Sequence, residues 1–160
     1  MANSYNCKKW RLHLLVPDSG QALVELVLTL PFLLLLLIGA AELGRLAYYS
    51  IEVSNAARAG VVYGAQNHVT AGDFTGMNIA AQNDAGDIVL TTKTAIHSCA
   101  CSNSYTATSA CTATFSCSGA NRIIEYVQQN TGATVSPMFR YPGVSTTYAV
   151  TGQAVMRVEQ

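Results

Sequence analysis

Charged residues are scarce in this chain, and their scarcity excludes some partners. Its 160 residues include nine basic and nine acidic side chains, and the formal net charge is zero. A protein that binds nucleic acid usually shows a strongly basic face, and no such cluster stands out, so we expect no nucleic acid as a partner. Half of the residues are apolar, and a chain of this length allows one membrane segment and one small domain.

Histidine is also rare, and the familiar catalytic motifs are missing. The histidines are His13, His68 and His97, and the sequence contains no His-Glu-x-x-His, no Gly-x-Ser-x-Gly and no phosphate-binding glycine loop. His97 precedes Cys99 and Cys101, but a single residue separates these cysteines, whereas paired zinc ligands usually have two or more between them. We therefore expect no enzyme, no bound metal and no other cofactor.

Charge is absent altogether from residues 26–41, which include an unbroken run of leucines at 33–37. Sixteen residues fall slightly short of the roughly 20 that a membrane-spanning helix needs. Extending the run back to Gln21 reaches that length, but it then includes Glu25. A carboxylate at that depth costs on the order of 3 kcal/mol on insertion scales, so we interpret Glu25 as a functional residue.

Basic residues and cysteines predict the same orientation in a membrane. Lys8, Lys9 and Arg11 precede the apolar run, and the positive-inside rule then places the N-terminus in the cytoplasm. Cys7 stands alone on that side, whereas the other four cysteines follow the apolar run. Those four would lie on the exported side, where disulfides persist. The sequence thus predicts a single-pass protein with an exported C-terminal region.

The helical pattern continues beyond the apolar run. Small and apolar residues follow one face at helical spacing, and no proline occurs between residues 32 and 136. We predict one helix from Gln21 to about Ala65, with a kink at Pro31 because proline removes a backbone donor and its ring clashes with the preceding turn.

Small residues recur at four-residue spacing late in this predicted helix, at Ala56, Gly60 and Gly64. Such a pattern lets another element approach the helix closely. The sequence leaves open whether that element belongs to the same chain or to a neighbouring subunit.

The first residues permit two interpretations. One is a secretory signal peptide cleaved near residues 39–41, where small side chains stand. The other is a leader of residues 1–20 that is cut on the cytoplasmic side after Gly20, which keeps the apolar helix in the mature protein. The second explains better why the helix continues past Ala41 and why Glu25 lies within the apolar run.

Several short blocks of this region occur together in order: Gly20, Ala22-Leu23-Val24-Glu25-Leu26, Leu30-Pro31 with the leucine run, Glu42-Leu43-Gly44-Arg45-Leu46, and Asn55-Ala56-Ala57-Arg58-Ala59-Gly60. With these blocks, the segment resembles the TadE-like segment of the tight-adherence (Tad, or Flp) pilus pseudopilins, which are related to type IV pilins. The resemblance covers residues 20–65 of the chain.

The resemblance implies cleavage between Gly20 and Gln21 by a prepilin peptidase and assembly through the N-terminal helix. Glu25 would become the fifth residue of the mature chain and pair with an N-terminal amine, commonly that of a neighbouring subunit. Two buried opposite charges are tolerable as such a hydrogen-bonded pair. The implied partners are the peptidase, other pilin or pseudopilin subunits and the assembly platform in the bacterial inner membrane. The implied roles are pilus biogenesis and adhesion, with the protein in that membrane and in an extracellular pilus.

Two departures from the pilin pattern indicate a minor subunit. Major type IV pilins usually begin with phenylalanine, often N-methylated, whereas this mature chain would begin with Gln21. The leader of about 20 residues is also longer than in many pilins. The alternative is a single-pass membrane-anchored protein whose exported domain binds a partner, with no processing and no polymerisation.

Residues 66–160 read as an exported sheet domain that packs with the long helix in an α+β fold. We predict a short helix at 73–84 with Asp73 as its N-cap, because aspartate accepts hydrogen bonds from the first free backbone N–H groups. Alternating and β-branched residues predict strands at 88–101, 111–117, 123–128, 133–141 and 147–158.

The four exported cysteines, Cys99, Cys101, Cys111 and Cys117, predict two disulfides with three possible connectivities. A hairpin closing over residues 102–110 would place Cys101 opposite Cys111. We therefore favour the pairs Cys101–Cys111 and Cys99–Cys117.

Overall fold

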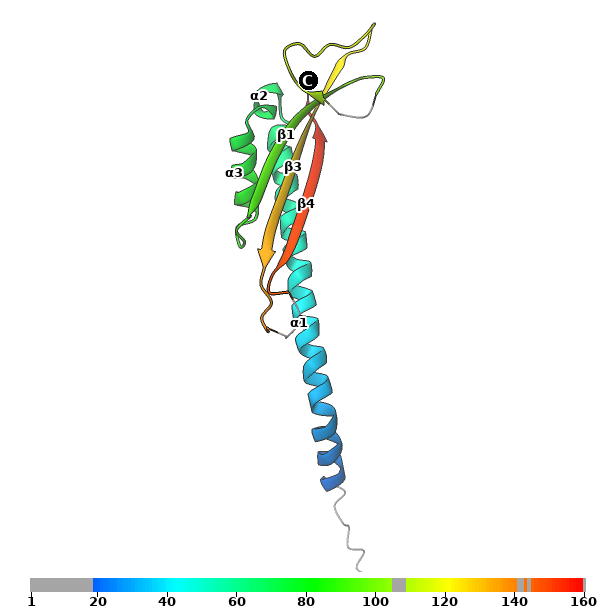
Figure 1. Cartoon of the computed structure of the whole chain (residues 1–160), viewed down its shortest axis with the longest axis vertical. Coiled ribbons are helices and arrows are strands. Elements are labelled where there is room, and N and C mark those ends of the chain that lie inside the picture. Colours follow the sequence, from blue (N-terminus) through cyan, green and yellow to red (C-terminus); the bar gives the residue numbers. More distant parts are fainter. Residues whose placement is uncertain (1–18, 105–108, 141–142, 144, 160) are drawn as a thin grey trace, which may run out of the picture. The chain divides into compact units, whose positions relative to one another are not determined.

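The computed structural model of the chain describes residues 19–104, 109–140, 143 and 145–159. It has the predicted α+β fold, with a long N-terminal helix, shorter helices and an antiparallel sheet (Figure 1). The chain divides into two compact units between Gly39 and Ala40. Within the described residues the first unit holds the beginning of the long helix, and the second holds the rest of the helix and the sheet. The predicted leader as far as Asp18, and Tyr141 at the end of a predicted strand, lie outside the described residues.

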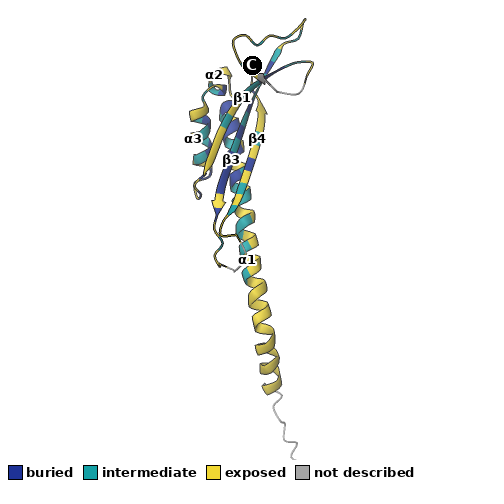
Figure 2. Cartoon of the chain, viewed as in Figure 1, coloured by how far each residue is buried: buried dark blue, intermediate teal, exposed yellow. Residues whose placement is uncertain are grey.

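Helix α1, Ser19–Gly64, has 46 residues and contains Pro31 within its length. Its apolar part is long enough and apolar enough to cross a membrane, with a mean hydropathy of 2.5 and none of that window buried. Figure 2 shows this first part of α1 as exposed. A helix satisfies its backbone hydrogen bonds internally, which is the condition that a segment must meet in lipid.

The second unit is built on one four-stranded antiparallel sheet in the order β2-β1-β3-β4. Strand β3 lies in the middle and pairs with β1 on one side and with β4 on the other, each over ten residue positions. The bounds are β1 Thr92–Cys101, β2 Ser109–Ala110, β3 Ile123–Val135 and β4 Tyr148–Arg157. The later part of α1 packs on one face of this sheet (Figure 1).

Strand β3 is one long strand where the sequence predicts two, at 123–128 and 133–141, so that prediction is wrong. The polar residues between them are buried within the domain and form hydrogen bonds there. The hydroxyl of Thr131 donates to the backbone carbonyl of Val53 in α1 at 2.7 Å, and the amide of Gln129 donates to Asn78 Oδ1 at 2.9 Å. Polar side chains with partners on the packed helices break the alternating pattern without breaking the strand.

The predicted strands at 88–101 and 111–117 also need correction. Strand β1 begins only at Thr92, because Ile88 and Leu90 are buried in the core beside α1 instead of extending the sheet. Residues 111–117 form no strand, and on the edge away from β3 the partner of β1 is the two-residue strand β2. The last predicted strand agrees closely with β4.

Two short helices follow α1. Helix α3, Phe74–Asp84, begins where predicted, and the Asp73 carboxylate accepts a hydrogen bond from Gly76 N–H at 2.9 Å as its N-cap. Helix α2, His68–Ala71, lies in a stretch that the sequence pattern presents as a polar connector. It forms because the side-chain oxygen of Asn67 accepts hydrogen bonds from the backbone N–H groups of Val69 and Thr70. In return, the hydroxyl oxygen of Thr70 accepts a hydrogen bond from the backbone N–H of Asn67, which completes a capping box.

Two disulfides close the end of the sheet, but with the opposite pairing to the one predicted. Cys99 bonds Cys111, and Cys101 bonds Cys117. The register explains the exchange, because Cys99 lies opposite Ser109 and not opposite a cysteine. Cys111 follows two residues after Ser109, so it lies diagonally across from Cys99 on the same face of the ladder. The predicted hairpin had placed Cys111 opposite Cys101, four residues out of register.

The core between α1 and the sheet depends on close approach of backbones. Val53 and Ala56 are fully buried on α1, and Gly152 of β4 lies against the backbone of Val53 and Ser54. A Cβ atom at Gly152 would lie 2.6 Å from the carbonyl oxygen of Val53 and 2.9 Å from the Cα atom of Ser54. Because these are backbone atoms, they cannot move aside as a side chain would.

The packing predicts that Gly152→Ala destabilises the protein. Overpacking of this kind typically costs about 1–3 kcal/mol of unfolding free energy. Gly44→Ala is the matched control, since a Cβ there meets nothing within 4 Å. That change should be neutral or stabilise α1 by up to about 1 kcal/mol. Thermal unfolding of both full-length variants in detergent, followed by circular dichroism, measures the difference. Equal melting temperatures for the two variants would contradict the close packing of β4 on α1.

Candidate functional site

The first candidate site is the exposed apolar half of α1. Its large side chains have little cover from the rest of the chain; Phe32 and Leu35 are each 71% exposed. Glu25 is the single acid among them, and its Oε1 lies 3.5 Å from Nε2 of Gln21, one turn earlier. The nearest basic residues in the sequence are Arg11 and Arg45, which lie 14 and 20 positions away from it. Within the described part of α1, the side chain that contacts the carboxylate of Glu25 is thus Gln21, which carries no charge.

The residues of the predicted cleavage site, Gly20 and Gln21, lie in the first turn of α1. Pro31 lies six residues beyond Glu25, inside the helix. Between them, the hydroxyl of Thr29 donates to the backbone carbonyl of Glu25 at 2.9 Å, so this hydroxyl is satisfied within its own helix. The polar side chains of this segment are thus few, and Glu25 alone carries charge.

The small residues on the later part of α1 face the chain's own domain. Ala56 is fully buried, a Cβ at Gly60 would lie 2.8 Å from Cγ of Gln129, and one at Gly64 would lie 2.7 Å from Sδ of Met77. The sequence left open whether this face packs on the same chain or on a neighbouring subunit. In the structure, the chain's own sheet and α3 pack against it.

The outer face of the same helix segment is exposed, and its residues recur every three or four positions. They are Gly44, Ala47, Ile51, Asn55, Arg58 and Val62, and we call them the outer stripe. The stripe is mostly small or apolar, with Arg58 as its one charged side chain. The sequence pattern did not single it out, because only the packing of the opposite face shows which side of α1 is free.

Two charged residues at the start of the second unit hold the connection between β3 and β4. The carboxylate of Glu42 accepts a hydrogen bond from the backbone N–H of Met138, and the guanidinium of Arg45 donates to the backbone carbonyl of Ser136. Arg45 also lies over the ring of Tyr49, with 6.0 Å between its Cζ and the ring centroid. The sequence shows these two residues as polar positions on a helix, and their loop partner, more than 90 residues away, leaves no local signal.

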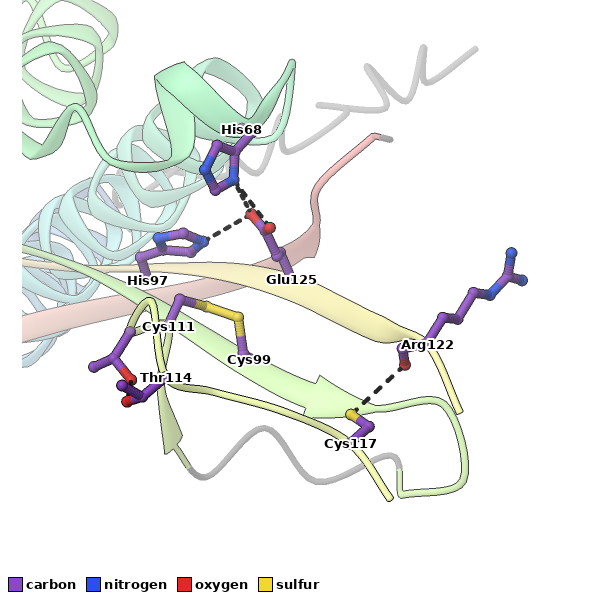
Figure 3. The surroundings of a disulfide bond; sticks show 9 residues. His68, His97, Cys99, Cys111, Thr114, Cys117, Arg122 and Glu125 are labelled. Carbon is purple, nitrogen blue, oxygen red and sulfur yellow. Dashed lines mark hydrogen bonds and ion pairs between the residues drawn. A yellow bond between two sulfur atoms is a disulfide. The ribbon is translucent and has the colours of Figure 1, made fainter. Parts of the chain in front are cut away.

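A second cluster joins α2 to the sheet near a disulfide (Figure 3). Glu125 of β3 lies between two histidines: Nδ1 of His68 is 2.9 Å from its carboxylate, and Nε2 of His97 is 3.0 Å from it. The side chains of His97 and Glu125 are largely buried, at 11% and 14% exposure, whereas His68 is 77% exposed. The cluster ties the start of α2 to β1 and β3, and the sequence pattern did not predict it.

The two histidines control the protonation of Glu125. Its burial raises the pKa, but the hydrogen bonds from His68 and His97 outweigh burial and hold the pKa below its ordinary value. At the start of α3, hydrogen bonds from the Gly76 N–H and the Tyr63 hydroxyl likewise lower the pKa of Asp73. Both carboxylates therefore stay ionised at neutral pH and act as acceptors that join elements of the domain.

His97 also lies close to sulfur, but the sulfurs are already bonded. A ring nitrogen of His97 and the Sγ atoms of Cys99 and Cys111 lie within 4.8 Å of one another, which is a spacing that a metal ion would suit. The two cysteines form a disulfide, so neither is available as a thiolate ligand. The arrangement suits a structural bridge at the end of the sheet.

Comparison with known proteins bears on the N-terminal part of the chain. Residues 20–61 match the family model of TadE-like proteins. The chain carries a TadE-like segment. The match begins at the predicted cleavage site and ends within the part of α1 that packs on the sheet. No curated protein and no solved structure matched the chain significantly.

The TadE-like match agrees with the resemblance seen in the sequence over the same segment. The matched segment lies on the helix that, among the described residues, is long and apolar enough to cross a membrane. The family model stops at residue 61, so the sheet, the disulfides and the His68–Glu125–His97 cluster lie outside the matched segment.

The cluster predicts how the stability of this protein depends on pH. Since the pKa of Glu125 is lowered from its ordinary value of 4.5, its ionised form stabilises the fold above about pH 4.5. That contribution is lost as the pH falls through the lowered pKa of the folded state. Glu125→Gln should cost about 1–3 kcal/mol at neutral pH, because two histidines lose a charged acceptor. It should also flatten the decline of stability below pH 4.5.

Chemical denaturation of the full chain in detergent measures both effects. The pH is varied from about 3 to about 7, a range that includes the ordinary pKa values of carboxylates. Asp84→Asn, at the exposed end of α3, is the matched control and should leave the pH profile as it is. If Glu125→Gln and Asp84→Asn give the same profile, the cluster does not stabilise the domain.

Proposed function

We propose that this protein is a minor pilin or pseudopilin of a Tad-type pilus, cleaved after Gly20 and assembled through α1. The observation that carries the proposal is the TadE-like match over a helix half whose large apolar side chains are exposed and which contains one acid, Glu25. Such a surface is stable in lipid before assembly and between neighbouring helices after it. A minor subunit fits the first residue, Gln21, and the long leader.

In this proposal cleavage supplies the missing partner of Glu25. Removal of residues 1–20 leaves a charged amine on Gln21, and Glu25 of a neighbouring subunit accepts a hydrogen bond from it. Removing one member of such a buried pair typically costs about 3–5 kcal/mol, since the other charge is left without compensation. The pair thus ties assembly to processing, because an uncut chain offers no amine at that position.

The two faces of the later part of α1 then have separate roles. The face with Ala56, Gly60 and Gly64 supports the chain's own sheet, and the outer stripe is available for the helices of other subunits. The exported sheet domain, closed by its disulfides, is presented outside the membrane during pilus biogenesis and adhesion. We expect no enzymatic activity, and we expect the prepilin peptidase and the inner-membrane assembly platform as partners.

Replacing Glu25 by leucine tests the proposal. Glu25→Leu should leave membrane insertion intact or improve it, because it removes a carboxylate from the apolar run. It should remove the protein from the assembled fraction, because the amine of Gln21 is left unpaired. Thr29→Leu is the control, since it also adds apolar surface one turn away but removes no charge. Carbonate extraction of membranes measures insertion, and immunodetection in sheared filaments measures assembly.

Each result has a defined meaning. Normal assembly of Glu25→Leu would contradict the charge-pair account. Failure of both variants to insert would contradict the membrane segment itself. Insertion of the unchanged protein without any cleavage or filament association would favour the alternative, a membrane-anchored exported binding protein.

A further inference from the structure

The connection between β3 and β4 is fixed to one turn of α1. Backbone groups of Ser136 and Met138 bond to the side chains of Arg45 and Glu42. Glu42 and Arg45 are the first charged residues after the uncharged run of residues 26–41. The loop is therefore held at the point of the chain where apolar sequence ends.

Helix geometry places this point at a definite depth. Arg45 lies four positions after Ala41, which is about 6 Å along a helix at about 1.5 Å per residue. The headgroup layer on each side of a bilayer is about 5–8 Å thick, since the hydrocarbon core is about 30 Å and the whole bilayer about 40–45 Å. If the apolar run spans the membrane, as the proposed function requires, Glu42 and Arg45 lie in the exported headgroup layer. A loop bonded to both side chains must lie there as well.

The loop exposes the residue types that suit this layer. Met138 is 61% exposed and Phe139 is 46% exposed, and the next residue, Arg140, is exposed too. Aromatic side chains are favoured at membrane interfaces, and a long basic side chain can extend its charge to the headgroups while its stem stays in apolar surroundings. An arginine guanidinium also binds phosphate through paired hydrogen bonds.

We propose that Met138, Phe139 and Arg140 form a second membrane contact, distinct from the span of α1. Met138 and Phe139 enter the layer between headgroups and upper acyl chains, and Arg140 binds the phosphate of phospholipids, preferentially in an anionic bilayer. Glu42 and Arg45 position the loop for this contact through its backbone. The inference rests on the proposed membrane insertion of α1, and it predicts a contact that the TadE-like segment alone does not contain.

Site-specific fluorescence in bilayers tests the contact. Single cysteines carrying an environment-sensitive NBD label are placed in a Cys7→Ser background at Met138, at Leu30 in the span and at Asn83 on α3. The four exported cysteines are held in disulfides and do not take the label. The full chain is reconstituted in vesicles of phosphatidylethanolamine and phosphatidylglycerol that contain lipids with a nitroxide at the headgroup or deep in the acyl chain.

The label at Met138 should show blue-shifted emission and strong quenching by the headgroup nitroxide. The label at Leu30 should be quenched by the deep nitroxide, and the label at Asn83 by neither. Phe139→Ser and Arg140→Gln, added to the Met138→Cys protein, should each weaken the headgroup quenching. The effect of Arg140→Gln should be larger in anionic vesicles than in vesicles of phosphatidylcholine.

The Leu30 label separates failure of this inference from failure of the proposed function. Quenching at Leu30 without quenching at Met138 would overturn the loop contact and leave the membrane span in place. Absence of quenching at Leu30 would overturn the span, and the loop contact with it. Equal quenching at Met138 and Asn83 would also contradict the proposal. So would a blue shift at Met138 without quenching by lipid, which would indicate that the loop contacts a protein partner instead.

Discussion

The constraint on which this protein depends is the apolar first part of α1. A helix with a mean hydropathy of 2.5 and with its leucines exposed is not stable in water, because burying one large apolar side chain is worth about 1.5–3 kcal/mol. The chain itself provides no cover for these side chains in the part that the structure describes. Lipid or the helices of other subunits must therefore cover them.

The same helix changes its role along its length. In its later part, small residues bring α1 close to the sheet, and Gly152 lets the backbone of β4 approach Val53. Buried hydrogen bonds then fix how α1 lies on the sheet, such as the one that the hydroxyl of Thr131 in β3 donates to the backbone carbonyl of Val53. The packed face is fully used, so the outer stripe is what this part of α1 can offer to a neighbour. The disulfides and Glu125 with its two histidines stabilise the end of the sheet where β1 ends and β3 begins.

Sequence reasoning reached the features that depend on local patterns. The apolar run, the long helix, the N-cap at Asp73 and the final strand follow from spacing and residue type alone. It failed where the structure at a residue depends on a partner that is distant in the sequence. The disulfide pairing depends on a register that places Cys99 opposite Ser109, and β3 continues through polar residues because Gln129 and Thr131 bond to α3 and α1. The contacts of Glu42 and Arg45 with the β3–β4 connection span 96 and 91 positions, and those of Glu125 with its two histidines span 57 and 28. No local pattern in a single sequence encodes them.

The central claim is that the chain is processed at Gly20 so that Glu25 gains an amine as its partner. N-terminal sequencing with the intact mass of the protein, taken from native membranes under non-reducing conditions, tests this claim most directly. The account predicts a chain that begins at Gln21, with a mass that includes two disulfides. A chain that begins at Met1, or one that begins near Glu42, would contradict it, because in neither case would Glu25 and a free amine of Gln21 exist together.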